Sequence, residues 1–161
     1  MRTVELFGRA AAGRVARVDD GDYDLVAGFR WYAWLARRPS GLVSGPYAVS
    51  ARGRVYMHKL ITGFAVTDHI DHDGLNNQRS NLRPATPSQN ACNRRAAFNG
   101  SSRFKGVTWH GARGKWQAAI GSGCSRYLGL FDVEADAARA YDAAARAAYG
   151  EYANVNFPEV A

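Results

Sequence analysis

The sequence predicts an α+β protein in two parts: a polar, β-containing N-terminal part, and a three-stranded antiparallel sheet packed on one helix. Three observations support this prediction. Short apolar runs fill the first 60 residues, a polar section occupies residues 61–98, and glycine-separated runs followed by an alanine-rich stretch close the chain. A length of 161 residues suits one ordinary domain or two small ones.

The first 60 residues indicate short strands and little helix. The run "DYDLVAGFRWYAWLARR" is rich in aromatic residues and predicts a short helix followed by a strand. In "GPYAVSARGRVYMHKLI", residues 47–49 and 55–57 form two alternating runs on either side of Gly53, which predicts β structure. The apolar residues 61–66 predict the start of another strand.

The central section combines a turn-forming segment with a helix start. The segment "GLNNQRSN" consists largely of residues that favour turns, and it can form the return loop of a hairpin. Ser88 is a good N-cap residue, so a helix is predicted from about Pro87 that carries Gln89, Asn90 and Asn93. The stretch "AAFNGSSRFKG" that follows is typical of a linker.

The residues after the linker give the clearest fold signal. "FKGVTWH", "GKWQAAIGS" and "SRYLGLF" are short runs separated by glycine-rich turns, as in an antiparallel meander. "DVEADAARAYDAAARAAYG" predicts a helix with Asp132 as its cap, acidic residues in its first turn and Gly150 as its stop. The sheet face beneath that helix is predicted to consist of Trp116, Ala118, Ile120, Leu128 and Leu130.

Charge is segregated along the chain, which has a formal net charge of +7. Residues 75–131 contain no Asp or Glu, whereas acidic residues outnumber basic ones beyond residue 131. The basic residues of the first stretch are Arg79, Arg83, Arg94, Arg95, Arg103, Lys105, Arg113, Lys115 and Arg126. This segregation favours contact between one part of the surface and a polyanion.

In the C-terminal part, the charges predict which surface faces nucleic acid. The helix is acidic and would repel phosphate. The open sheet face would carry Lys105, Thr108, His110, Lys115 and Gln117. Strands fit into a major groove. The predicted partner is therefore double-stranded DNA, bound through the strands.

Composition argues against several other classes of protein. No apolar run approaches the ~20 residues needed to cross a bilayer, and the N-terminal residues lack the continuous apolar stretch of a secretory signal. Cys92 and Cys124 are far apart, which argues against a disulfide framework. We expect a cytoplasmic protein with no membrane contact and no evident protein partner, present as a monomer or homodimer.

The segment "DHIDHDGLNNQRSN" at residues 68–81 carries the candidate chemistry. A calcium loop ending at Asp73 and Gly74 would need its first ligand at His69 and its twelfth at Ser80, and neither is acidic. A closed zinc site would need four ligands. The candidate zinc ligands are limited to His58, His69, His72 and the remote Cys92.

Phosphodiester hydrolysis fits the same segment better. Attack by water needs a base with a pKa near neutrality, and histidine is the natural choice. A hard ion such as Mg²⁺ takes oxygen ligands and keeps several waters, so one Asp and one Asn carbonyl would suffice. Asp68 and His69 are adjacent and would point to opposite sides of a strand unless it bends there. We interpret Asn77 as a turn residue and His58 as a core residue, with a catalytic or substrate contact as the alternative for His58.

The C-terminal motifs "FKGVTWH", "GKWQAAI", "YLGLFDVEADAARAYDAAA" and "ANVNFP" resemble the apetala-two/ethylene-response-factor DNA-binding domain. The resemblance covers residues 101–158 and implies that three strands read DNA. It implies contact roles for Lys105, Thr108, His110, Lys115 and Tyr127. Candidate phosphate contacts in the same part are Arg113 and Arg126, and Arg103 is a further candidate DNA-binding residue. Plant members carry arginine at several positions where this chain has Thr108, His110 and Gly121, so no particular target sequence is implied.

The run "VYMHKLITGFAVTDHIDHDGLNNQRSNLRPATPSQNACN" resembles the HNH (ββα-metal, or His-Me finger) endonucleases of phages and introns. With its upstream extension the likeness covers about residues 15–95. The resemblance implies that His69 is the general base and that Asn81 steadies the hairpin and the histidine. It also implies that Asp68 and Asn90 hold the metal. The spacing of twelve residues from His69 to Asn81, and nine more to Asn90, suits the subgroup whose third letter is asparagine.

These interpretations predict an HNH module with a β-rich extension at residues 1–98 and a DNA-binding domain at residues 101–158. The predicted function is a sequence-directed DNA endonuclease of the homing type, encoded by a phage or mobile element, which uses Mg²⁺ or Mn²⁺. His72 receives no catalytic role. Predicted phosphate contacts near the site are Arg79, Arg83, Arg94 and Arg95. The alternatives are a DNA-binding regulator with an inactive HNH module, and an enzyme that acts on RNA.

Overall fold

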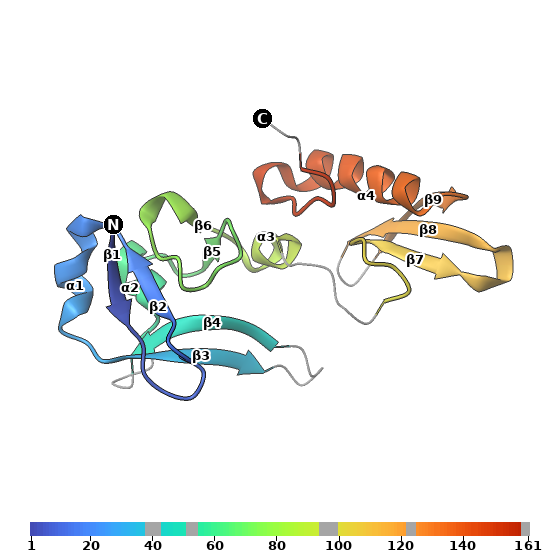
Figure 1. Cartoon of the computed structure of the whole chain (residues 1–161). Coiled ribbons are helices and arrows are strands. Elements are labelled where there is room, and N and C mark those ends of the chain that lie inside the picture. Colours follow the sequence, from blue (N-terminus) through green and yellow to red (C-terminus); the bar gives the residue numbers. More distant parts are fainter. Residues whose placement is uncertain (38–42, 51–54, 94–99, 122–124, 159–161) are drawn as a thin grey trace. The chain divides into compact units, whose positions relative to one another are not determined.

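Short antiparallel strand pairs and short helices build the N-terminal part of the chain (Figure 1). The computed structural model describes residues 1–37, 43–50, 55–93, 100–121 and 125–158. Its contacts divide the chain into unit 1 (Met1–Thr86) and unit 2 (Pro87–Ala161). Both units mix helices with small antiparallel sheets, which confirms the α+β class. The domain limits at residues 98 and 101 stay a prediction.

The strand pairs of unit 1 join neighbours in the sequence. They are β1 (Arg2–Glu5) with β2 (Val15–Val18), β3 (Trp31–Arg37) with β4 (Val43–Ser50), and β5 (Thr67–His69) with β6 (Leu82–Pro84). The helical elements between them are η1 (Asp20–Asp22), α1 (Tyr23–Ala27), α2 (Met57–Thr62) and the 3-10 turn η2 (Arg79–Asn81). The succession of α1 and β3 confirms the short helix and strand predicted for that stretch.

The core of unit 1 forms where α1, α2 and the strands meet. Trp31 and Met57 are fully buried in it, and complete burial of a large apolar side chain contributes about 1.5–3 kcal/mol. Trp31 also donates a hydrogen bond from Nε1 to the backbone oxygen of Val26 (2.9 Å), which ties β3 to α1. Leu75 and Leu82 belong to the same core, so the β5–β6 hairpin is packed onto it.

The strand predicted at residues 55–57 is wrong. Tyr56 makes a single bridge to Val49, and Met57 already begins α2. Met57 and Ile61, four residues apart, are both buried, which is the spacing of one helix face. Gly53, which separates the two predicted runs, lies outside the described residues.

The strand predicted to start at residues 61–66 is also misplaced. Ile61 lies in the last turn of α2, which ends at Gly63 in the left-handed conformation (φ 70°). The strand proper, β5, begins only at Thr67. The return loop was placed correctly, because β5 and β6 pair antiparallel with residues 70–81 between them.

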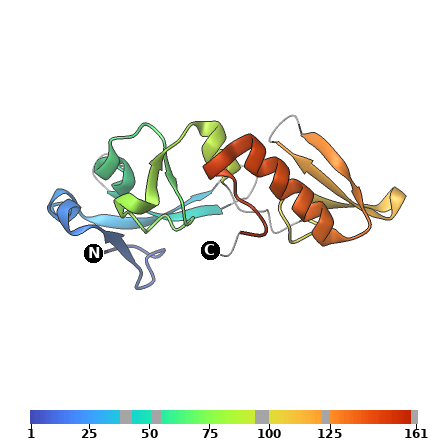
Figure 2. The same ribbon diagram turned by 90° about the horizontal axis from the view of Figure 1, so that it is seen from above.

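Unit 2 contains the three runs that were predicted as strands. They form an antiparallel sheet in the order β7 (Val107–His110), β8 (Lys115–Ile120) and β9 (Arg126–Phe131). Helix α4 (Glu134–Tyr149) runs along this sheet (Figure 2), followed by η4 (Gly150–Tyr152). None of the helices in the described parts of the chain is long and apolar enough to cross a membrane.

Small side chains let α4 lie close to the sheet. Ala137, Ala138 and Ala145 are fully buried against residues of the strands, among them Ala118 and Ile120. Of the other residues predicted beneath the helix, Trp116 and Leu128 pack there, and Phe131, which was not predicted, packs there as well.

The ends of α4 agree with the prediction at one end only. Gly150 ends the helix with a positive φ of 53°. Asp132 is not the cap, because the helix begins at Glu134 and Val133 occupies the cap position. The Asp132 carboxylate lies 3.0 Å from the Lys115 ammonium instead.

Two buried contacts fix the rest of unit 2 to α4. A Cβ on Gly106 would meet the Tyr141 ring at 1.9 Å, so only glycine allows the chain to pass α4 this closely. Asp142 is buried and accepts hydrogen bonds from the backbone of Asn156 (2.7 Å) and Phe157 (2.8 Å). The C-terminal segment is therefore held against the helix.

Helix α3 (Pro87–Cys92) opens unit 2, and residues far along the chain hold its end. Lys105 Nζ donates to the backbone oxygen of Cys92, and Asn154 Nδ2 donates to that of Asn93 (3.2 Å). The predicted cap, Ser88, is wrong: the helix already begins at Pro87, whose fixed φ and missing N–H suit a first helical position.

Candidate functional site

The β5–β6 hairpin places the first two candidate residues of the sequence motif. Asp68 pairs with Arg83 across the hairpin, and His69, the last residue of β5, pairs with Leu82. Asp68 and His69 are both buried, at 3% and 7% exposed. Unit 1 therefore encloses a carboxylate and an imidazole at successive positions of one strand.

The His69 ring is surrounded by other rings and one amide. The His58 ring meets it edge-on, with 5.0 Å between ring centres and an interplanar angle of 89°. The Tyr47 ring lies at 5.9 Å. In the loop that joins β5 to β6, Asn77 Oδ1 lies 3.4 Å from His69 Nε2. The imidazole is thus held by side chains from β4, α2 and the hairpin loop.

Both histidines of this cluster resist protonation. Burial lowers the pKa of His69 below its ordinary value, against the opposing influence of Asn77 and of the carboxylates of Asp71 and Asp68. Burial, with the nearby His69, lowers the pKa of His58 to about 3. His69 is consequently a neutral imidazole near neutral pH, the form that can accept a proton.

Asp68 forms an ion pair inside the hairpin. Arg83 Nε lies 2.9 Å and Arg83 Nη2 lies 2.8 Å from Asp68 Oδ2. Both side chains are nearly inaccessible, at 11% and 4% exposed. Arg83, predicted to contact phosphate, therefore neutralises the carboxylate that the sequence assigns to the metal.

Asn81 holds the hairpin loop together. Its Oδ1 accepts a hydrogen bond from the backbone of Asp71 (2.9 Å), and its Nδ2 donates to Asp71 Oδ1 (2.9 Å) and to the backbone oxygen of Asn76 (2.8 Å). Burial raises the pKa of Asp71, but the hydrogen bonds from Asn76, Asp73 and Asn81 outweigh it and lower that pKa overall. The loop is closed around an ionised Asp71.

The same loop is joined to β2 and β4. The backbone N–H of Asn77 donates to the carbonyl of Arg17 (2.8 Å), and the Arg17 guanidinium lies 2.8 Å from Asp73. A Cβ on Gly74 would lie 2.5 Å from the Tyr47 ring, so glycine is required for this approach. These contacts fix the loop residues that face His69.

Arg79, another predicted phosphate contact, is engaged within unit 1. Its Nε and Nη2 donate to the two carboxylate oxygens of Asp22 (2.8 and 2.7 Å), and Nη2 also donates to the carbonyl of Ile61. Its backbone N–H donates to Asp19, which lowers the pKa of that carboxyl. The structure thus gives Arg79 a role in joining η1, α2 and η2.

The remaining candidates of the motif lie beyond unit 1. Asn90 lies on α3, in unit 2. Arg94 and Arg95 lie outside the described residues. The joint role of Asp68 and Asn90 at a metal stays a prediction. Among the described residues, the structure contains no group of three or more His, Cys, Asp or Glu side chains that could hold a metal ion.

The sheet of unit 2 presents most of the residues predicted to contact DNA. Thr108 pairs with Gln117, and His110 pairs with Lys115, across β7 and β8. Alternation along the strands puts these four side chains on one face, opposite to Ala118 and the core. Tyr127 pairs with the next residue of this face, Ala119, and is 58% exposed. We call Thr108, His110, Lys115, Gln117 and Tyr127 the open face.

The other basic candidates of unit 2 differ in their surroundings. Arg113, in η3 (Gly111–Arg113), and Arg126, at the start of β9, are exposed. The guanidinium of the exposed Arg103 lies 4.9 Å from the centre of the Phe104 ring. The Lys105 ammonium donates a hydrogen bond at the end of α3, and its DNA contact stays a prediction.

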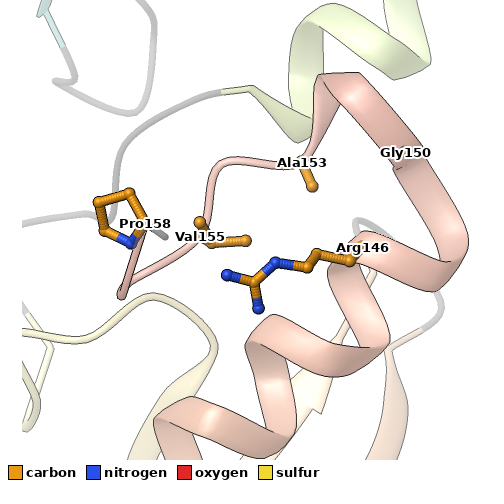
Figure 3. Close-up of a pocket in the computed structure, with 5 residues that line it drawn as sticks. All are labelled: Arg146, Gly150, Ala153, Val155 and Pro158. Carbon is orange, nitrogen blue, oxygen red and sulfur yellow. The ribbon is translucent and has the colours of Figure 1, made fainter. Parts of the chain in front are cut away.

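A pocket of unit 2 lies away from the open face. It is lined by Arg146, Gly150, Ala153, Val155 and Pro158 (Figure 3). Arg146 extends from α4 towards the C-terminal segment and donates to the carbonyl of Phe157 (2.8 Å). The pocket contains none of the candidate residues, and the arginine in it serves to hold the C-terminal segment.

Two residues next to His69 were not assigned to the site by sequence reasoning. Asn77 was interpreted as a turn residue, yet it is fully buried and its amide faces the imidazole. His58 was interpreted as a core residue, and it is buried, but against His69 itself. The sequence signal for Asn77 was its place in an Asn-Asn pair. His58 could have been assigned to the site only if residues 57–62 had been predicted as a helix.

Known proteins with similar sequences fall into two groups. The chain is 30% identical to an uncharacterized HNH endonuclease of Acanthamoeba polyphaga mimivirus, over 94% of the chain and 79% of that protein. Over 61 residues, 36% of the chain, it is 51% identical to APETALA2-like protein 2 of Oryza sativa subsp. indica. Over 67 residues it is 46% identical to dehydration-responsive element-binding protein 2D of Arabidopsis thaliana. The match spans 14% of the rice protein and 31% of the Arabidopsis protein. No protein-family model matches the chain.

Proposed function

The chain belongs to the HNH endonucleases, and from this premise we propose that it is a metal-dependent, sequence-directed DNA endonuclease of the homing type. The observation that carries the proposal is the buried, neutral His69 at the end of β5, adjacent to Asp68 and faced by the hairpin loop. Such a histidine is suited to general-base catalysis of phosphodiester hydrolysis.

In the proposed reaction His69 activates the attacking water. The imidazole takes one proton from the water as its oxygen bonds to phosphorus, and the bond from phosphorus to the 3′ oxygen breaks. The 3′ oxygen takes up a proton from solvent water, and His69 returns its proton to solvent, which leaves 5′-phosphate and 3′-hydroxyl ends. Asn81 serves this step indirectly, because its hydrogen bonds close the loop that faces His69.

We assign Asp68 and Asn90 to a divalent ion, Mg²⁺ or Mn²⁺. One carboxylate and one amide oxygen form a hard donor set that suits such an ion, which keeps several waters when bound. When bound, the ion would stabilise negative charge on the phosphate and on the leaving oxygen. The backbone of Asp68 is held by its pairing with β6, which fixes where the carboxylate starts, and Arg83 is its ion-pair partner in the absence of a metal.

DNA recognition is assigned to unit 2. The open face offers hydrogen-bonding side chains from three adjacent strands, and the helix on the other side of the sheet carries the acidic residues. The similarity to the rice and Arabidopsis proteins supports DNA binding by this part. Proposed phosphate contacts around the open face are Arg103, Arg113 and Arg126. A monomer with one such site would nick one strand, and a homodimer could cut both.

The second candidate function is a DNA-binding regulator whose nuclease module is inactive. The ion pair of Asp68 with Arg83 favours it, because a guanidinium at the carboxylate competes with a metal ion. This candidate predicts specific DNA binding that persists in a chelator, together with no cleavage under any divalent ion.

Incubation with supercoiled plasmid and Mg²⁺ tests the proposal. We expect nicked or linear product, and we expect that His69→Ala removes it. The matched control is His72→Asn, since His72 has a positive φ (65°) that asparagine adopts readily. Absence of product from the unaltered protein with either ion, or product unchanged by His69→Ala, would refute the proposal. Competition with duplex RNA distinguishes the two nucleic acids as substrates.

A further inference from the structure

We infer that Asn77 is a positioning residue that fixes the tautomer of His69, with hydrogen on Nε2 and the proton-accepting lone pair on Nδ1. The inference rests on the proposed function for its catalytic consequence, but it concerns a property of the protein without DNA or metal. It begins from one distance, 3.4 Å between His69 Nε2 and Asn77 Oδ1.

The orientation of the Asn77 amide is set by its other contacts. Its Nδ2 donates to the backbone oxygen of Leu75 (3.2 Å), which needs the nitrogen on that side of the amide. The oxygen is thereby left facing His69. Asn77 is fully buried, and its backbone N–H is bound to Arg17 in the β2 strand. Neither rotation of the amide nor exchange of its ends is compatible with these contacts.

An amide oxygen accepts hydrogen bonds and donates none. His69 Nε2 must therefore carry the hydrogen in this contact. A neutral imidazole has only one N–H, so a hydrogen on Nε2 leaves Nδ1 with the lone pair.

The tautomer matters because a general base must present a lone pair to the water it activates. With the hydrogen on Nδ1 instead, the same ring in the same place would offer the water a donor at that position. Tyr47 and His58 lie against the ring and restrict its reorientation. Asn77 thus fixes Nδ1 of His69 as the atom that accepts the proton.

The two loop asparagines have different tasks on this view. Asn81 bonds to Asp71 and Asn76 and maintains the course of the loop. Asn77 extends its side chain to the imidazole. A substitution of Asn81 is expected to loosen the loop, whereas a substitution of Asn77 is expected to change the hydrogen placement on His69.

Nitrogen-15 NMR of the histidine rings tests this directly. The chain has four histidines, and the His69 signals are assigned by their loss in His69→Gln. In the unaltered protein at pH 7.5 without metal, we expect a protonated Nε2 and an unprotonated Nδ1. Observation of hydrogen on Nδ1 overturns the inference, whether or not the protein cleaves DNA, so its failure is distinct from failure of the proposed function.

Substitutions connect the tautomer to activity. Asn77→Leu removes the acceptor, and we expect a mixture of tautomers together with a fall of about 10–100-fold in kcat, the usual effect of losing an orienting partner, with KM retained. Asn77→Asp keeps an acceptor oxygen and should keep the Nε2–H tautomer and most of kcat. A folded Asn77→Leu protein with unchanged tautomer and unchanged kcat overturns the inference. If Asn77→Leu does not fold, the spectrum of the unaltered protein decides alone.

Discussion

Asp68 and Arg83 lie directly opposite each other on β5 and β6 and form a buried ion pair, with 2.8 Å between Arg83 Nη2 and Asp68 Oδ2. The pair joins β5, whose last residue is His69, to β6. Its two members were expected to act separately, one on a metal ion and one on DNA phosphate. Their pairing gives each a structural role that can be measured.

Removal of one partner should be more harmful than removal of both. Arg83→Ala leaves a buried carboxylate without its cation, and such a loss typically destabilises a protein by about 3–5 kcal/mol. Urea unfolding of Arg83→Ala, Asp68→Ala and the double variant measures the effect. We expect the loss in the double variant to be well below the sum of the single losses. Additive losses would show that the two side chains are energetically independent.

Stability should fall as the pH falls from 6.5 towards 4.5, because of the buried histidines. In the folded protein the pKa of His58 is lowered to about 3, so the unfolded chain takes up a proton at a pH where the folded one does not. Each pH unit below 6.5 therefore costs about 1.4 kcal/mol for His58 alone, with a further loss from His69.

Unfolding free energies measured in urea between pH 7.5 and 4.5 check this expectation. The variant His58→Phe replaces the ring with one that does not titrate, and its stability should depend less steeply on pH. Asp71 and Asp19 act mainly below this window, because their folded-state pKa values lie below the ordinary 3.8 and the stability they contribute is lost only as the pH falls past that value. A pH dependence that is the same in His58→Phe would contradict the assignment.

Arg113 should contribute to DNA affinity through phosphate. It is exposed in the turn between β7 and β8. We expect Arg113→Ala to weaken binding to all duplexes and to reduce the slope of log affinity against log salt by about one. The matched control is Arg139→Ala on α4, because Arg139 is exposed but paired with Asp136. Equal effects of the two substitutions would argue against binding through the strands.

Lys105 should act on stability more than on DNA. Its ammonium binds the carbonyl of Cys92, and a hydrogen bond to a charged group is worth about 1.5–3 kcal/mol. Lys105→Met keeps the aliphatic part, so it should destabilise the protein by about that amount while the salt dependence of DNA binding stays the same. Calorimetric unfolding and binding titrations at several salt concentrations check both. A changed salt slope with unchanged stability would return Lys105 to the DNA contacts.

Local sequence signals were sufficient for much of the fold. The strands and helix of unit 2 were predictable because local sequence indicates them: glycine-rich turns separate the strands, and the helix is rich in alanine. Residues 57–62 were harder, because a six-residue helix shows too little periodicity to differ from a strand. The cap of α4 was predicted wrongly for a different reason: Asp132 has the right chemistry for a cap, but its carboxylate pairs with Lys115.

The sequence motif was sufficient to name candidate residues, and their functional roles stay a prediction, but it could not predict which side chains contact one another. His69, Asn81 and Asp68 follow from the motif and its spacing. The partner of Arg79 does not, because Asp22 lies 57 residues away in the sequence. Which of two adjacent asparagines reaches the histidine depends on the register of the loop against β2, and this register is set by tertiary contacts with Arg17.

The attachment of α3 bears on how proteins of this kind could be retargeted. A graft that begins only at Gly100 would bring in foreign residues at positions 105 and 154, and the carbonyls of Cys92 and Asn93 would lose these donors. A graft that begins at Pro87 would carry the helix together with the residues that hold it. The proposed DNA-binding sheet and the contacts that position Asn90 on α3 would then be transferred together in one segment.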